Sequence, residues 1–199
     1  SFGDIAASSF GGMVYYTSLD RSSLLEQLQN QSIKAICDTD WKDLTIIRLP
    51  EIPNFTLLVG WTGQVAITDS LIQATEKKRK VETDNAFYKE FLAKSHAIVQ
   101  GLQNAWNNQD IPALQEGIRA NRALLNEFAQ VMQLEIETPA LQTLCDLAEQ
   151  NGACAKTSGA GGGDCGICFT QSEQQRQQIE NQWAKAQIQV LPLSIAEAW

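Results

Sequence analysis

The chain has 199 residues, 44% of them hydrophobic, which is enough for one sizeable core or two small ones. Its 15 Lys and Arg against 23 Asp and Glu give a formal net charge of −8, which argues against the general phosphate attraction of nucleic-acid-binding proteins. The one dense basic run, KKRK at 77–80, is expected to be a solvated helix face. No apolar run is long enough to cross a bilayer. We therefore expect a soluble globular protein with neither nucleic acid nor membrane as a partner.

The cysteines predict a reduced, cytoplasmic setting, because their number is odd and no secretory signal is evident. They are Cys37, Cys145, Cys154, Cys165 and Cys168. The CxxC spacing of Cys165 and Cys168 leaves a zinc or redox site open. However, these two residues lie in an apolar run that is typical of a strand, on which residues three apart point to opposite faces. The single histidine, His96, lies in a distant helical pattern, so we expect no metal site.

The first third of the chain is predicted to be mostly sheet. Asp4 is placed to cap a short helix that ends at Gly11-Gly12. Strand-like runs follow at 13–18, 33–37, 44–50 and 55–61, with a loop or helical turn at 24–28. The last two runs are separated by a proline-containing turn, which favours a hairpin. The opening stretch has no initiator methionine and reads as mid-protein, so we expect a missing N-terminal part.

The rest of the chain is predicted to be mainly helical. Four helices are predicted, at about 68–80, 84–107, 110–133 and 138–152. Capping residues at 68–70 and Thr138-Pro139 mark the start of the first and the last, and apolar residues at helical spacing indicate the others. A strand at 164–169, a polar helix at 171–186 and a short strand at 187–191 complete the pattern. Helices and strands in this order predict an α+β fold.

The segment KTSGAGGGDCGICF, residues 156–169, combines a glycine-rich loop with a buried strand. Glycines tolerate positive φ and let other atoms approach the main chain, so several N–H groups can converge on an anion. A lysine and two hydroxyl groups just before the glycines favour phosphate. A tight turn that only reverses the chain is the alternative. The loop does not match the P-loop pattern GxxxxGK[ST], because its lysine precedes the glycines.

Three segments carry a resemblance to a known family. GACAKTSGAGGGDCGICF at 152–169 resembles the third signature motif of the GHMP kinases, and within that family it is most similar to the phosphomevalonate kinase branch. SFGDIAASSFGG at 1–12 resembles the loop that carries the family's active-site aspartate, and VGWTGQVAITDSLI at 59–72 is similar to the segment that joins the two domains. The order and spread of the three segments make the resemblance specific.

The resemblance implies a two-part organisation. Residues 1–60 are expected to be a remnant of the family's N-terminal ribosomal S5-like domain, and residues 61–199 its ferredoxin-like C-terminal domain. The family's PGK-like strand and its PxxxGLGSSAA-type nucleotide loop are not found in this sequence. We therefore expect the chain to be inactive by itself.

The implied reaction is the ATP- and Mg²⁺-dependent phosphorylation of (R)-5-phosphomevalonate to the diphosphate, in the mevalonate pathway of isoprenoid biosynthesis. Asp4 matches the family's active-site aspartate, and Lys156 is a candidate for neutralising phosphate charge. The resemblance points to further residues at the substrate, which are Ser158, Gly159, Ala160, Gly161, Gly162, Gly163, Trp61, Thr62 and Ser70. Because the acceptor phosphate is mostly ionised near neutral pH, we expect Asp4 to orient the substrate rather than remove a proton. A plain capping role for Asp4 and a surface position for Lys156 are the alternatives.

Other functions stay open at this point. Mevalonate kinase, or another small-molecule kinase of the family, is the nearest. A non-catalytic metabolite-binding or dimerisation module differs in class, as does a zinc or redox module at the CxxC. Apolar surface left where strands are missing predicts self-association of the chain.

Overall fold

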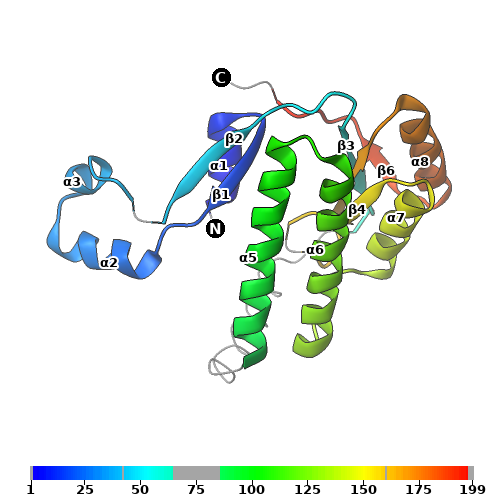
Figure 1. Cartoon of the computed structure of the whole chain (residues 1–199). Coiled ribbons are helices and arrows are strands. Elements are labelled where there is room, and N and C mark those ends of the chain that lie inside the picture. The colour runs from blue at the N-terminus through cyan, green and yellow to red at the C-terminus, as the bar shows by residue number, and fades with distance from the viewer. Residues whose placement is uncertain (1, 42, 65–85, 160, 197–199) are drawn as a thin grey trace. The chain divides into compact units, whose positions relative to one another are not determined.

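The computed structural model describes residues 2–41, 43–64, 86–159 and 161–196 (Figure 1). It divides into two compact units, which are described separately. The N-terminal unit comprises Ser1–Glu51 with Ile195–Trp199, and the C-terminal unit comprises Ile52–Ser194. The helix predicted at 68–80, the KKRK run and Ser70 lie outside the described residues.

The N-terminal unit begins with helix α1 (Gly3–Phe10), which ends at Gly11 with φ 64°, as predicted. The expectation that Asp4 caps this helix is wrong. Phe2 occupies the cap position and Asp4 lies in the first helical turn, where a carboxylate is favourable near the N-terminal end of the helix dipole. The chain continues as strand β1 (Met13–Thr17), which pairs antiparallel with β2 (Thr45–Leu49).

The segment between these strands is helical. Helix α2 (Arg21–Asn30) is longer than the turn expected at 24–28, because Asp20 caps it by accepting a hydrogen bond from the Ser22 N–H group at 2.9 Å. The strand expected at 33–37 is instead helix α3 (Ile33–Cys37), which Ser32 caps through the Ala35 N–H group. A five-residue apolar run has the composition of a strand and of a short helix alike, and here the cap decides the outcome.

The predicted hairpin between the runs at 44–50 and 55–61 is wrong. Both runs are strands, but β2 pairs with β1, with Met13 opposite Leu49. Strand β3 (Thr56–Trp61) pairs instead with two strands of the C-terminal unit. Residue composition identified the two strands correctly. It contains no information on which strands they pair with, because those strands are distant in sequence.

The C-terminal unit is built on an antiparallel sheet in the order β4-β5-β3-β6. The three further strands are β4 (Cys154–Thr157), β5 (Cys165–Thr170) and β6 (Gln189–Leu191). The helices are α5 (Ala86–Asn107), α6 (Ile111–Met132), α7 (Pro139–Gln150) and α8 (Glu173–Lys185). Helices α5 and α6 lie side by side (Figure 1). The mixed helix and sheet fold matches the predicted α+β class.

The division between the units lies after Glu51, nine residues before the domain boundary expected at 60. Strand β3 accounts for the difference, because its pairing with β5 and β6 makes it part of the C-terminal sheet. The assignment of the two units to the two domains of the family stays a prediction.

Two glycines of the sheet allow its helices to pack closely against it. Gly60 of β3 lies directly opposite Gly166 of β5. A Cβ atom at Gly166 would lie 2.5 Å from Leu144 Cδ2, and one at Gly60 would lie 2.8 Å from both Leu144 Cδ1 and Trp183 Cζ3. Leu144 and Trp183 are fully buried, so the missing side chains let α7 and α8 approach the sheet closely. This contact fixes the start of β5, where the glycine-rich loop ends.

The cysteines are free thiols in the described structure. Cys168 is buried and Cys165 is partly exposed, as expected for two residues on opposite faces of a strand. Burial raises the pKa of Cys145 to about 12 and that of Cys154 to about 11. Within the described residues no group of three or more His, Cys, Asp or Glu side chains is placed to hold a metal ion. In the same part of the chain, no helix has the length and apolar character that a membrane span requires.

Candidate functional site

The glycine-rich loop, residues 158–164, connects β4 to β5 and is therefore a hairpin loop. Strand β4 was not predicted, because CAKT is short and has weak strand character. The hairpin is closed by a 2.9 Å hydrogen bond from the Ser158 N–H group to the Cys165 carbonyl oxygen. Left-handed backbone angles recur along the loop, at Gly159, Gly161, Gly162, Gly163 and Asp164. Glycine is favoured at such positions because it lacks a Cβ atom.

Hydrogen bonds to two distant segments hold the loop in place. The Gly162 N–H group donates to the Ile136 carbonyl oxygen at 2.7 Å. On the other side, the Asp164 carbonyl oxygen accepts hydrogen bonds from the N–H group of Thr62 at 2.9 Å and from its hydroxyl at 3.0 Å. The Asp164 N–H group donates to Gln64 at 2.7 Å. The loop is therefore fixed between the end of β3 and the connection that follows α6.

The loop retains donors for an anion. The N–H groups of Gly159, Gly161 and Gly163 have no hydrogen-bond partner among the described residues, and neither has the Ser158 hydroxyl. Gly161 and Gly163 are buried, and a buried N–H group without a partner is costly. A bound anion would satisfy these groups. The Gly162 N–H group, which was expected to be a further donor, is instead occupied by Ile136.

Lys156 provides a positive charge two residues before the loop. It is half-buried in β4, and its ammonium group donates to the Thr157 carbonyl oxygen at 2.8 Å. Burial lowers the pKa of Lys156, because a charged ammonium is poorly solvated there. Among the described residues no carboxylate forms an ion pair with it. A half-buried cation that has no carboxylate partner among the described residues favours binding of an anionic ligand.

The other predicted site residues fall into three groups. Thr62 contacts the loop directly, whereas its neighbour Trp61 lies half-buried in β3 opposite Cys165. Ala160 and Ser70 lie outside the described residues. Asp4 is exposed on α1 of the N-terminal unit, so its role at the site stays a prediction.

The residue type of Ile136 did not indicate that it belongs to this site. Its carbonyl oxygen accepts from Gly162, and its carbonyl oxygen and Cγ2 atom occupy the space that a Cβ atom at Gly161 would need. A main-chain acceptor can be contributed by any residue type, so residue chemistry could not have revealed it. The need for glycine at 161 was the available signal.

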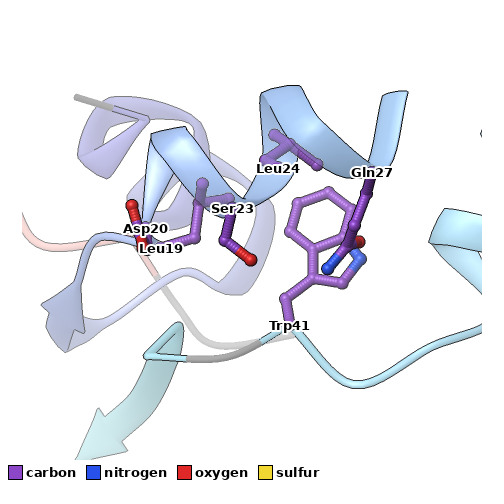
Figure 2. Close-up of a pocket in the computed structure, with 6 residues that line it drawn as sticks. All are labelled: Leu19, Asp20, Ser23, Leu24, Gln27 and Trp41. Atoms are coloured by element: carbon purple, nitrogen blue, oxygen red, sulfur yellow. The ribbon is translucent and has the colours of Figure 1, made fainter. Parts of the chain in front are cut away.

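Among the described residues of the N-terminal unit, a small hollow and a larger one can be distinguished. Figure 2 shows the smaller one, where the Trp41 ring faces Leu24 and Gln27 of α2. Its volume is about 10 Å³, which is room for a single water molecule and excludes a metabolite. A larger hollow of about 330 Å³ is lined almost entirely by apolar side chains from α1, β1, β2 and their neighbours. It offers no charged group for a phosphate.

Comparison with known proteins assigns the C-terminal unit to a family. Residues 98–189, which include the loop, match the family described as "GHMP kinases C terminal". The chain carries a GHMP kinase C-terminal domain. A phosphomevalonate kinase from Streptomyces sp. (strain CL190) is 35% identical over 198 residues, which are 98% of this chain and 52% of that protein. The resemblance to phosphomevalonate kinases seen in the motifs is thereby confirmed.

Solved structures agree with this assignment to the GHMP kinases. A Lin0012 protein from Listeria innocua has a TM-score of 0.93 and 32% identity, over 99% of this chain and 55% of that one. Streptococcus pneumoniae phosphomevalonate kinase, in complex with phosphomevalonate and AMPPNP, has a TM-score of 0.80 and 28% identity, over 96% and 54% of the two chains. The chain thus spans about half the length of each of these three relatives.

Proposed function

We propose that this chain contributes the phosphate-acceptor side of an ATP-dependent phosphomevalonate kinase. Two observations carry the proposal. The glycine-rich loop has N–H groups without a partner among the described residues, and Lys156, two residues before the loop, has no ion pair with a described carboxylate. The names of the Streptomyces and Streptococcus relatives, and the phosphomevalonate bound in the latter structure, support this substrate.

In the proposed reaction, an oxygen of the phosphate of (R)-5-phosphomevalonate attacks the γ-phosphorus of ATP. The bond from that phosphorus to the β,γ-bridging oxygen breaks, and ADP leaves as the second product. Phosphoryl transfer needs mainly alignment and charge neutralisation. The N–H groups of Gly159, Gly161 and Gly163 and the Ser158 hydroxyl would hold the acceptor phosphate, while Lys156 offsets its charge. Asp4 would orient the substrate, because the phosphate's second pKa of about 6 removes the need for a base.

The groups that bind the nucleotide in the family are not found here, because its nucleotide loop is missing from this sequence. In the proposal, ATP with Mg²⁺ is therefore bound largely outside this chain, and the chain acts as part of a larger kinase. A cytoplasmic location, small-molecule partners only, and self-association of the isolated chain belong to the same proposal.

Calorimetric titration of the chain with phosphomevalonate tests the acceptor site. We expect saturable binding that Lys156→Met weakens by about tenfold, the loss of one charge-assisted contact. Lys185→Met is the matched control, because Lys185 is exposed in the last turn of α8 and should leave the affinity unchanged. Mevalonate, which has no phosphate, should not bind. Equal binding of mevalonate would instead favour a mevalonate kinase. Equal losses of affinity in the two lysine variants would show that Lys156 does not take part in binding.

A further inference from the structure

The connection between α6 and α7, residues 133–138, is held at three consecutive residues. The Ile136 carbonyl oxygen accepts from the loop at Gly162. The Glu137 carboxylate accepts from Arg122 on α6. The Thr138 hydroxyl caps α7 by accepting from the Leu141 N–H group at 3.4 Å. The position of the Ile136 carbonyl is therefore tied to both helices.

Arg122 makes the strongest of these attachments. Its Nε atom donates to Glu137 Oε2 at 2.8 Å and its Nη2 atom to Glu137 Oε1 at 2.6 Å, a paired geometry. The same Nη2 atom donates to Asp146 Oδ1 on α7 at 2.7 Å, and Asn126 adds a fourth hydrogen bond, to Glu137 at 3.2 Å. The Glu137 side chain is only 7% exposed and that of Arg122 16%. Pairing of this kind in a buried setting holds both partners in one geometry, because either charge left alone would be poorly solvated.

Glu137 is connected to the glycine-rich loop through its neighbour Ile136, whose carbonyl oxygen contacts the loop. Ile136 is the preceding residue and is itself buried, so its carbonyl oxygen has little freedom once Glu137 is fixed. That oxygen holds Gly162 by a hydrogen bond and lies against Gly161, where no Cβ atom fits. The two neighbouring N–H groups, of Gly161 and Gly163, have no hydrogen-bond partner among the described residues.

We propose that Arg122 is a positioning residue for phosphate binding. Through Glu137 it fixes the Ile136 carbonyl, which holds Gly162 and keeps the N–H groups of Gly161 and Gly163 in the conformation that accepts the phosphate. Arg122 itself does not touch the ligand. The phosphate as ligand rests on the proposed function, whereas the control of the loop by Arg122 rests on the contacts alone.

The test compares Arg122→Gln with Arg119→Gln. Arg119 lies one turn earlier on α6 and also forms an ion pair, with Glu149 at 2.7 Å, and a hydrogen bond to the Ala153 carbonyl at 3.3 Å. None of its contacts reaches residues 133–138, so it controls for the general loss of an arginine that joins α6 to its neighbours. Two quantities are measured, the hydrogen-exchange rate of the Gly162 amide by NMR and the affinity for phosphomevalonate by calorimetry.

We expect Arg122→Gln to speed exchange at Gly162 and to weaken phosphomevalonate binding, each by about tenfold, while Arg119→Gln changes both less than twofold. Arg122→Lys should restore little, because a lysine cannot form the paired contact with Glu137. Unchanged exchange at Gly162 in Arg122→Gln, or the same change in both glutamine variants, would overturn the inference. If the unmodified chain binds no phosphomevalonate, the proposed function fails, and the exchange rates still decide whether Arg122 positions the loop.

Discussion

Substitution of Gly161 by alanine is expected to destabilise the C-terminal unit strongly, whereas alanine at Gly159 is expected to cost much less. Both residues have left-handed backbones, with φ of 75° at Gly161 and 62° at Gly159. Their surroundings differ, because a Cβ atom at Gly159 would meet nothing within 4 Å. At Gly161 the same atom would collide with the Ile136 carbonyl oxygen and lie 2.6 Å from its Cγ2 atom.

The left-handed backbone costs alanine about 1–2 kcal/mol at either position. At Gly161 two further costs arise, because the collision separates Ile136 from Gly162. Loss of that hydrogen bond contributes about 0.5–1.5 kcal/mol, and forcing a methyl group into filled space contributes about 1–3 kcal/mol. We therefore expect the free energy of unfolding to fall by roughly 2–4 kcal/mol more in Gly161→Ala than in Gly159→Ala.

Urea denaturation followed by tryptophan fluorescence measures this difference, because Trp106 and Trp183 are buried in the C-terminal unit. The two variants should unfold with the same dependence on urea concentration and with separate midpoints. Equal losses of stability in the two variants, or a larger loss in Gly159→Ala, would show that Ile136 does not confine the loop at Gly161.

Further predictions concern the core, the charge at the site, the thiols and association. Gly166→Ala should lower the free energy of unfolding by about 1–3 kcal/mol in urea denaturation, because Leu144 fills the space of the added methyl group; an unchanged midpoint would contradict the packing. Lys156→Met should raise the free energy of unfolding at pH 7 relative to the unmodified chain. The pKa of Lys156 is lowered on folding, so its charged form destabilises the folded state. This destabilisation is complete below the folded pKa and declines as pH rises towards the unfolded value of 10.5; a pH-independent difference in stability between the two proteins would contradict this. In a thiol titration at pH 8, exposed Cys37 should react first and the buried cysteines only on unfolding; rapid reaction of more than two thiols would argue against their burial. Light scattering should detect self-association of the chain through exposed apolar residues of the N-terminal unit, and a clean monomer would refute it.

Local sequence signals predicted the long helices well. Helices α5, α6 and α7 follow from apolar spacing, and the start of α7 predicted at Thr138 is confirmed by its cap. Strand pairing could not be obtained in this way. Residues 44–50 and 55–61 are neighbours in sequence, yet their partners lie at Met13–Thr17 and at Cys165–Thr170.

The candidate site shows the same division between local and distant information. Glycine content and the preceding lysine pointed to an anion-binding loop, since those properties belong to the segment itself. The contacts of the loop with Ile136 and Thr62 join residues far apart in the chain, and Ile136 contributes only a main-chain oxygen. Only the folded arrangement shows that Gly162 is occupied internally while Gly161 and Gly163 have no described partner.

An NMR titration of the ¹⁵N-labelled chain with phosphomevalonate tests the central claim most directly. We expect saturable shifts at the amides of Gly159, Gly161 and Gly163, with a smaller change at Gly162, whose N–H group is already bonded to Ile136. Mevalonate at the same concentration should leave all four amides unchanged. Absence of shifts at the loop with phosphomevalonate, or equal shifts with mevalonate, would contradict a phosphate site in this loop.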